Sequence, residues 1–304
     1  MENDVSYMIK KNGNIKSPFR YAGGKFYARK LILEHIPKHI TYIEPFCGGA
    51  SIFFAKEKVK ENILNDIDEE LINCFIQIRD NPLKIADVLK GIPASKEKHT
   101  FFKKEFKPKN DIERAARWFY LNRTSYSGIM NMQNCFWGYG DKYSMRPENW
   151  RAHLLLTSSK LQDVNLTCKD FQKVIENASD NSFLFIDPPY YNRDQDKFYA
   201  HSITKEDHLR LMKTLGEHSH RLKFLITYDN EDDIKEIYSW ANHILEKQWN
   251  YMIYRTDDQT KNGNGKDKKH FSKRYQGREI FILNFESPAI NKKEYKEMKL
   301  TSFI

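Results

Sequence analysis

The 304-residue sequence predicts an α/β fold, in which helices cover both faces of a largely parallel sheet. Short apolar runs alternate with helical patterns toward both ends of the chain, as parallel strands joined by helices do. A middle stretch, residues 81–161, contains no convincing buried strand and predicts a helical insertion. We therefore expect a discontinuous sheet domain over 15–80 and 162–290, a helical domain over 81–161, and tails at 1–14 and 291–304.

The first predicted strands lie before the insertion. Residues 42–44 form a short strand that runs into a glycine turn at 47–49, and a helix follows over 50–55. Residues 62–66 form a second strand, ahead of a helix that begins near Glu69. Ligands of such sheets bind at the carboxyl ends of the strands, so residues that follow a strand are the first candidates for function.

Three more predicted strands follow the insertion, at residues 165–168, 182–186 and 223–228, each ahead of a helical pattern. Near the C-terminus, residues 251–255 and 279–284 are predicted to be the two strands of a long hairpin. The loop that joins them is rich in lysine and either contacts phosphates or is simply solvated.

The charge of the chain is compatible with a nucleic-acid partner. It carries 50 Lys and Arg residues against 41 Asp and Glu, which gives a formal net charge of +9 and a pI of about 9.1. A basic surface attracts phosphate backbones, although a lysine-rich composition also arises from AT-rich coding DNA. The charge alone therefore leaves nucleic-acid binding open.

Composition disfavours several classes of protein. No apolar run approaches the roughly 20 residues that a transmembrane helix needs, and the acidic, polar start of the chain is not typical of a secretory signal. The four cysteines are far apart and form no CxxC pair, so we expect neither a zinc site nor a disulfide framework. We expect no metal and a location in the reducing cytoplasm.

The strongest local signal follows the predicted strand at 182–186 and consists of Asp187, Pro188, Pro189 and Tyr190. Consecutive prolines cannot continue a strand ladder, so one interpretation is a rigid turn that ends the strand. A bare turn needs neither an acid before the prolines nor an aromatic residue after them. The two prolines leave the Pro188 carbonyl without a local donor and fix Asp187 and Tyr190 in space.

These groups suit a planar ring that carries an amino group. The Asp187 carboxylate and a proline carbonyl supply two acceptors for its two N–H donors, and the Tyr190 ring offers a stacking face worth roughly 1–3 kcal/mol. The amino nitrogen of adenine is a poor nucleophile because its lone pair is delocalised into the ring. Two acceptors would favour a tetrahedral nitrogen with its lone pair free for attack, which is a form of transition-state stabilisation.

The order of the motifs resembles that of the Dam-like family of DNA adenine-N6 methyltransferases over about residues 17–285. The resemblance implies a Rossmann-like methyltransferase sheet, S-adenosylmethionine as the methyl donor and double-stranded DNA as the substrate. It also implies direct methyl transfer to the N6 of an adenine flipped out of the duplex. Besides the Asp-Pro-Pro-Tyr motif, the segments that carry it are residues 21–25, residues 43–51, Asn65-Asp66 and Lys169-Asp170-Phe171.

The resemblance also implies where the methyl donor binds. The glycine turn would let backbone amides approach a carboxylate, although any tight turn between a strand and a helix needs the same residues. Asp66 suits hydrogen bonds from a ribose diol, although Asp66 or Asp68 could instead cap the next helix. Asp170 and Phe171 match the family's adenine-binding acid and aromatic, with a helix cap and a core phenylalanine as the alternatives. The predicted donor-binding residues are Tyr21, Ala22, Gly23, Lys25, Glu44, Pro45, Phe46, Gly48, Gly49, Asp66, Asp170, Phe171 and Asp187.

The insertion lies where the family carries its target-recognition domain. Residues 123–128 resemble the start of the family's DNA-contacting loop, in which Tyr126 either fills the space of a flipped base or belongs to the core. Members that read GATC often place an arginine three residues after this segment, where it suits bidentate contact with guanine. This chain has Asn131 there, so we expect a target other than GATC. The predicted DNA contacts are Arg20, Arg123, Thr124, Ser125, Tyr126 and Asn131.

Other functions use similar motifs. Cytosine-N4 and protein glutamine methyltransferases usually carry serine or asparagine in place of Asp187, which disfavours both. An RNA adenine methyltransferase is compatible with the same pocket. A catalytically inactive DNA-binding relative is the nonenzymatic alternative, disfavoured by the intact Asp187, Tyr190, Asp66 and Lys25. A cognate restriction endonuclease is a candidate partner, and neither the recognition sequence nor the oligomeric state follows from the sequence.

Overall fold

One mixed sheet organises the part of the chain that the computed structural model describes, namely residues 15–21, 23–140, 144–191, 201, 203–250 and 276–291. Its strands run in the order β3-β2-β1-β4-β5-β7-β6, with β1 to β5 parallel and β7 antiparallel to both of its neighbours. The predicted α/β fold is confirmed. The strands are β1 Thr41–Glu44, β2 Glu61–Asn65, β3 Val164–Thr167, β4 Phe183–Ile186, β5 Lys223–Asp229, β6 His243–Asn250 and β7 Gln276–Leu283.

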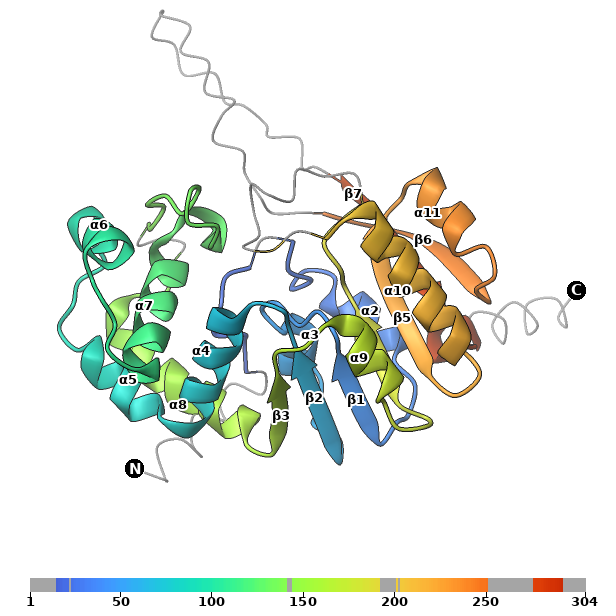
Figure 1. Cartoon of the computed structure of the whole chain (residues 1–304), viewed down its shortest axis with the longest axis horizontal. Helices are drawn as coiled ribbons and strands as arrows, with labels where there is room; N and C mark the ends of the chain where they lie inside the picture. The colour runs from blue at the N-terminus through green and yellow to red at the C-terminus, as the bar shows by residue number, and fades with distance from the viewer. Residues whose placement is uncertain are drawn as a thin grey trace, which may run out of the picture.

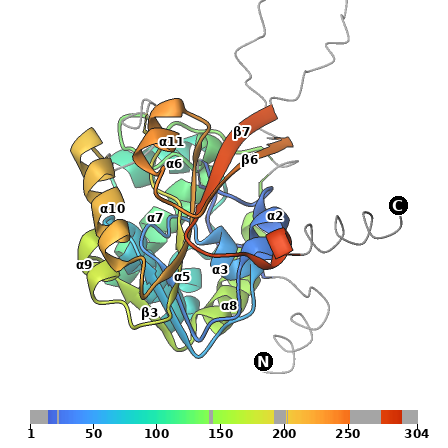
Figure 2. The ribbon, with the colours of Figure 1, turned by 90° about the vertical axis from the view of Figure 1, so that its right-hand side faces the viewer.

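Helices cover both faces of this sheet, as the two perpendicular views show (Figures 1 and 2). Residues of α2 and α3 share one hydrophobic cluster with alternate strand residues such as Tyr42 and Phe183. Residues of α9, α10 and α11 share a second cluster with the intervening residues, such as Ile43 and Leu184. The alternation follows from the two-residue period of a strand. These helices are α2 Arg29–His35, α3 Ser51–Ala55, α9 Phe171–Glu176, α10 Lys205–His218 and α11 Asp232–Ile237.

The remaining helices gather beyond the β3 edge of the sheet, on the left in Figure 1. Their buried side chains, including Trp118 and Trp150, belong to the same hydrophobic cluster as strand residues of the sheet. The helical region therefore packs continuously onto the sheet, and its separation as a domain over 81–161 stays a prediction. These helices are α4 Glu69–Asp80, α5 Pro82–Val88, α6 Lys96–Lys104, α7 Asp111–Thr124 and α8 Trp150–Leu161.

The path of the chain creates a crevice between β1 and β4. From β1 the chain moves outward to β2 and β3, and it then returns to place β4 on the other side of β1. Loops that leave the carboxyl ends of two such strands diverge, which opens a binding crevice at that edge. The glycine turn follows β1 and Asp187 follows β4, so both lie at this switch point.

The C-terminal hairpin differs in part from the expectation. The strand expected at 279–284 is β7, Gln276–Leu283, and its partner β6 is His243–Asn250. β6 precedes the expected partner at 251–255, which lies outside the described residues together with most of the lysine-rich loop. Its polar residues Glu246, Lys247 and Gln248 hide the strand signal in the sequence, because an edge strand need be apolar on one face only.

Within the described ranges, none of the helices has the length and apolar character needed to cross a membrane.

Candidate active site

A cavity of about 320 Å³ opens at the carboxyl edge of the sheet. Segments from across the chain line it: the N-terminal segment, the loops after β1, β2, β3 and β4, and the start of α10. Every predicted catalytic or donor-binding residue that the structure describes lies in its wall, while Ala22 is outside the described residues. These residues are Tyr21, Gly23, Lys25, Glu44, Pro45, Phe46, Gly48, Gly49, Asp66, Asp170, Phe171, Asp187, Pro188, Pro189 and Tyr190.

The glycine turn after β1 needs glycine for two separate reasons. Gly48 has a φ of +44°, in the left-handed region that side chains disfavour. A Cβ added there would lie 2.8 Å from Cε1 of Tyr21, so the ring could not pack against the turn. The Gly48 amide donates a hydrogen bond of 2.9 Å to Oδ2 of Asp66, which ties the turn to the end of β2.

For Asp66 the sequence left two roles open, binding a ribose diol and capping the next helix, and Asp68 was a second candidate for the cap. Asp68 caps α4, because its carboxylate accepts from the amides of Glu70 and Leu71. Asp66 lies in the cavity wall and accepts from the amides of Gly48 and Asp68, at 2.9 and 3.1 Å. Burial raises its pKa to about 6. The helix cap therefore does not explain Asp66.

Glu44 is largely a structural residue. It is 1% exposed, and its Oε1 accepts from the Tyr42 hydroxyl at 2.7 Å and from the Phe53 amide at 2.9 Å. Burial raises its pKa to about 8. The side chain thus joins β1 to the start of α3 while still forming part of the cavity wall.

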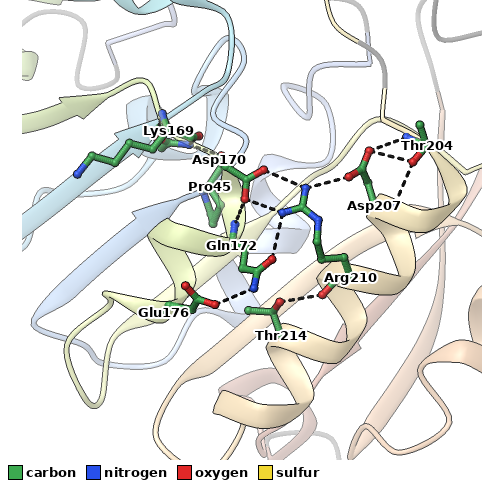
Figure 3. Close-up of polar contacts among 10 residues, drawn as sticks. Pro45, Lys169, Asp170, Gln172, Glu176, Thr204, Asp207, Arg210 and Thr214 are labelled. Carbon is green, nitrogen blue, oxygen red and sulfur yellow. Dashed lines mark hydrogen bonds and ion pairs between the residues drawn. The ribbon is translucent and has the colours of Figure 1, made fainter.

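Asp170 combines a helix cap with an ion pair (Figure 3). It is the N-cap of α9, and Oδ1 accepts from the Gln172 amide at 2.9 Å. Arg210 of α10 donates to Oδ1 and Oδ2 at 2.7 and 2.9 Å, which lowers the pKa of Asp170. Phe171 is 5% exposed and packs against Phe46, with ring centroids 5.2 Å apart. The capping and core-packing alternatives are thus both realised, at residues that also line the cavity.

A buried cluster lies behind the Asp-Pro-Pro-Tyr motif. Lys25 is 2% exposed, and its Nζ lies 2.6 Å from Oδ1 of Asp187 and 2.7 Å from the Tyr190 hydroxyl. The Thr227 hydroxyl of β5 donates to the same Asp187 oxygen at 2.7 Å. Within the described residues, the protein's contacts to this carboxylate are made to Oδ1. Oδ2 is therefore left to accept a hydrogen bond from a ligand in the cavity.

Glu279 of β7 completes this cluster. Its Oε1 accepts a hydrogen bond of 2.6 Å from the Tyr190 hydroxyl, and its Oε2 lies 3.7 Å from Lys25 Nζ. Burial raises the pKa of Glu279 to about 7, although Lys25 opposes that shift. The ring of Tyr190 is therefore anchored at its far end by an acid 89 residues later in the chain.

Sequence reasoning missed Thr227, Glu279 and Arg210. Thr227 and Glu279 are polar residues inside or beside apolar runs, which is the one signal that pointed to them. Arg210 lies on the polar side of an amphipathic helix, where arginine is usually solvated, so no signal distinguished it.

The predicted DNA contacts divide into buried and accessible side chains. Arg123 is 6% exposed, and Thr124 and Ser125 are fully buried at the end of α7. The Thr124 hydroxyl donates to the Tyr120 carbonyl at 2.7 Å and pairs with His99 at 2.8 Å. As placed, these three side chains support the segment rather than face a partner, and their direct contact with DNA stays a prediction.

Arg20, Tyr126 and Asn131 are accessible. Tyr126 is 40% exposed, while Arg20 is half-buried and its Nη1 donates to the Ser125 carbonyl at 3.2 Å. Asn131 accepts from the amides of Gln133 and Asn134, so it also shapes its own loop. Buried Asn122 was not predicted, yet its amide bonds both backbone groups of Arg20 and links the N-terminal segment to α7.

The arrangement can hold a planar amino-bearing ring beside a second ligand. The Asp187 Oδ2 atom and the Pro188 carbonyl offer acceptors at the motif. The turn after β1, Asp66 and Asp170 line the rest of the same cavity, at the edge where ligands of parallel sheets bind. Two bound molecules would therefore meet next to Asp187.

Comparisons with known proteins agree with this geometry. A model of the D12 class N6 adenine-specific DNA methyltransferase family matches residues 21–253. The chain is 29% identical over 248 residues to the Type II methyltransferase M.CviBI of Paramecium bursaria Chlorella virus NC1A, covering 79% of this chain and 93% of that protein.

Two further relatives come from an archaeon and a bacterium. Identity is 29% over 228 residues to the Type II methyltransferase M.MjaIII of Methanocaldococcus jannaschii, covering 66% of this chain and 78% of the relative. It is 29% over 189 residues to the DNA adenine methylase of Escherichia coli strain K12, covering 60% of this chain and 66% of the relative.

Proposed function

The chain belongs to the D12 class N6 adenine-specific DNA methyltransferase family, and from that premise we propose that its methyl donor and its target adenine meet in the cavity beside Asp187. The enzyme transfers a methyl group from S-adenosylmethionine to the N6 amino group of adenine in DNA. The observation that supports the location is the convergence of the Asp-Pro-Pro-Tyr motif, the glycine turn and Asp66 on one cavity.

The cavity wall suits the parts of the donor. S-adenosylmethionine supplies an electrophilic methyl group when it is bound. Asp66 is an acid at the end of β2, where a carboxylate can accept from a ribose diol. Asp170 offers an acceptor and Phe171 an apolar surface for an adenine ring, and the backbone of the glycine turn allows close approach of an amino-acid end.

The catalytic motif binds and orients the target amino group in this proposal. Oδ2 of Asp187 and the Pro188 carbonyl each accept a hydrogen bond from the amino group. These two bonds favour a tetrahedral nitrogen whose lone pair is free for attack on the methyl group. Lys25 and Thr227 hold the other Asp187 oxygen, so the carboxylate keeps one orientation. The nitrogen sheds its proton readily once it is methylated, so Asp187 need not be a strong base.

Access to the target requires a flipped base. An adenine stacked in a duplex cannot reach Asp187, and extruding it costs a few kcal/mol. Basic residues of the helical region would offset this by binding the phosphate backbone. Arg20, Tyr126 and Asn131 are the accessible candidates for contacts near the target, and Asn131 suits adenine better than guanine.

One experiment separates this proposal from its alternatives. The protein is incubated with labelled S-adenosylmethionine and either duplex DNA, single-stranded DNA or RNA, and modified bases are mapped by sequencing. We expect N6-methyladenine at one short sequence motif in duplex DNA. Label in RNA alone would support the RNA methyltransferase, and tight DNA binding without label would support the inactive relative.

A restriction endonuclease is the candidate partner of this enzyme. Two of the relatives described above are Type II methyltransferases, which suggests a cognate restriction endonuclease as a partner. The cytoplasm is the location that we propose for the enzyme. Co-expression with neighbouring genes, followed by a DNA cleavage assay, tests for the endonuclease.

A further inference from the structure

Arg210 occupies a central position in the polar network of Figure 3. Its guanidinium donates to both oxygens of Asp170, at 2.7 and 2.9 Å, and to Oδ1 of Asp207 at 2.8 Å. It also donates to the Gln172 side chain at 3.1 Å. Arg210, Asp170 and Asp207 all line the cavity. A planar, bidentate pair of this kind fixes geometry as well as charge.

The Asp170 carboxylate has more hydrogen-bond acceptor positions than its ion pair with Arg210 uses. An ionised carboxylate has about four lone-pair positions, two on each oxygen. Within the described residues, Oδ1 of Asp170 receives the Gln172 amide and one Arg210 nitrogen, while Oδ2 receives the other Arg210 nitrogen. One position on Oδ2 is left, which matches a single N–H donor.

The other contacts of Arg210 limit its movement. Asp207 accepts from the Thr204 amide and hydroxyl, both at 3.0 Å, in a capping box at the start of α10. The same Asp207 therefore secures the helix end and one side of the guanidinium. On the other side the guanidinium carbon lies 4.2 Å from the centroid of the Phe171 ring, a cation–π contact. Arg210 thus contacts both members of the Asp170-Phe171 pair.

We propose that Arg210 is a positioning residue for the methyl donor: it orients the Asp170 carboxylate so that the one remaining acceptor position of Oδ2 meets the amino group of the donor's adenine. This inference rests on the proposed binding of the donor in the cavity. It extends that proposal because it gives Arg210 of α10 a role in orienting the acid that the donor's adenine would meet.

Two ligands that differ in that group provide the test. S-adenosylhomocysteine carries the amino group, and its purine analogue has hydrogen in that place. Their dissociation constants are measured by calorimetry for the wild type, Arg210→Met, Arg210→Lys, Asp170→Asn and the control Lys213→Met. Lys213 lies on the same helix and is 76% exposed. The measured quantity is the ratio of the two constants, because a general loss of structure would weaken both ligands alike.

The wild type should prefer S-adenosylhomocysteine by about tenfold, as a charge-assisted hydrogen bond predicts. Arg210→Met should bring this ratio close to one, Arg210→Lys should restore it in part, and Lys213→Met should leave it unchanged. In methylation assays, Arg210→Met should raise KM for the donor about tenfold with kcat nearly unchanged.

The possible failures are distinguishable. If the wild type and Asp170→Asn bind both ligands equally, the proposed donor orientation is wrong and the role of Arg210 falls with it. If Asp170→Asn loses the preference but Arg210→Met keeps it, the Arg210 inference alone is overturned. Should Arg210→Met not fold, as judged by circular dichroism, an unchanged ratio in Arg210→Lys would overturn it equally, because lysine cannot make two parallel hydrogen bonds.

Discussion

The cavity and the segment at 123–131 are built in opposite ways. The cavity is assembled from segments far apart in the sequence, yet their side chains share one wall. The segment at 123–131 is continuous, yet Arg123, Thr124 and Ser125 are buried while Tyr126 is 40% exposed. Residues that are adjacent in the sequence therefore need not share a surface. Residues that follow parallel strands do lie together, at one edge of the sheet.

The two regions differ because regular strand pairing positions the residues of the cavity, whereas no such pairing positions the residues at 123–131. Parallel pairing of β1, β2, β3 and β4 brings their carboxyl ends to one edge, whatever the lengths of the connections. The end of α7 has no such rule, and local hydrogen bonds decide where each side chain points. The Ser125 hydroxyl, for example, turns back to the Leu121 carbonyl at 2.5 Å.

The largest effect should come from Asp187→Asn in the cavity. Asparagine keeps the size of the side chain but loses the charge that faces Lys25 and the target amino group. We expect methyl transfer to fall by about 100-fold to 1,000-fold, as for other groups that stabilise a transition state. Radiometric methylation measures the rate, and calorimetry with S-adenosylhomocysteine checks that the donor still binds. Retained activity would remove Asp187 from the mechanism.

A smaller loss should follow from Glu279→Ala, which removes the acceptor of the Tyr190 hydroxyl. We expect kcat to fall about tenfold because the Tyr190 ring loses its anchor. Glu279→Gln retains a carbonyl acceptor and should stay within about threefold of the wild type. Tyr190→Phe cuts the same hydrogen bond, so the double variant with Glu279→Ala should lose little more than either single variant. Fully additive losses would show that the two residues act separately.

Within the segment at 123–131, Tyr126→Ala should weaken duplex DNA binding about tenfold, since stacking on a base is worth roughly 1–3 kcal/mol. The thermal unfolding temperature of the Tyr126→Ala variant should not change, because the Tyr126 side chain is exposed. The matched control is Thr124→Val, which removes two buried hydrogen bonds. That variant should unfold more easily, by about 1–3 kcal/mol, with DNA affinity nearly intact. The reverse pattern would place Thr124 rather than Tyr126 at the DNA.

The last prediction concerns the pH dependence of stability. Glu44 has a pKa of about 8 in the folded protein, well above its ordinary value, because it is buried. The folded state keeps this proton up to about pH 8 while the unfolded state releases it, so the contribution of Glu44 to stability is lost as pH rises. Glu44→Gln should reduce the decline of the unfolding free energy between about pH 5 and 8, by at most ~1.4 kcal/mol per pH unit. Denaturant titrations without donor measure this slope, and an unchanged slope would mean that Glu44 stays ionised.

The sequence predicted the cavity far better than the segment at 123–131. The glycine turn, Asp66 and Asp187 directly follow strands, so their convergence is a consequence of topology. Glu279 escaped this rule because it lies within a strand and does not follow one. In antiparallel β7 it pairs with Asp229, the last residue of β5, and therefore lies near the edge where β1 and β4 end. The burial of Arg123 and Thr124 depends on how α7 packs, which sequence periodicity alone does not determine.

The place of β7 in the sheet also bears on how the enzyme is made. β7 is the last strand in the described chain, yet it lies between β5 and β6. A polypeptide leaves the ribosome in chain order, so Tyr190 emerges long before the acid that anchors it. A nascent chain can therefore display the glycine turn and the catalytic motif while Tyr190 still lacks this anchor. We expect such a chain to methylate DNA more slowly than the finished enzyme until β7 has paired, so that full activity reports the pairing of β7.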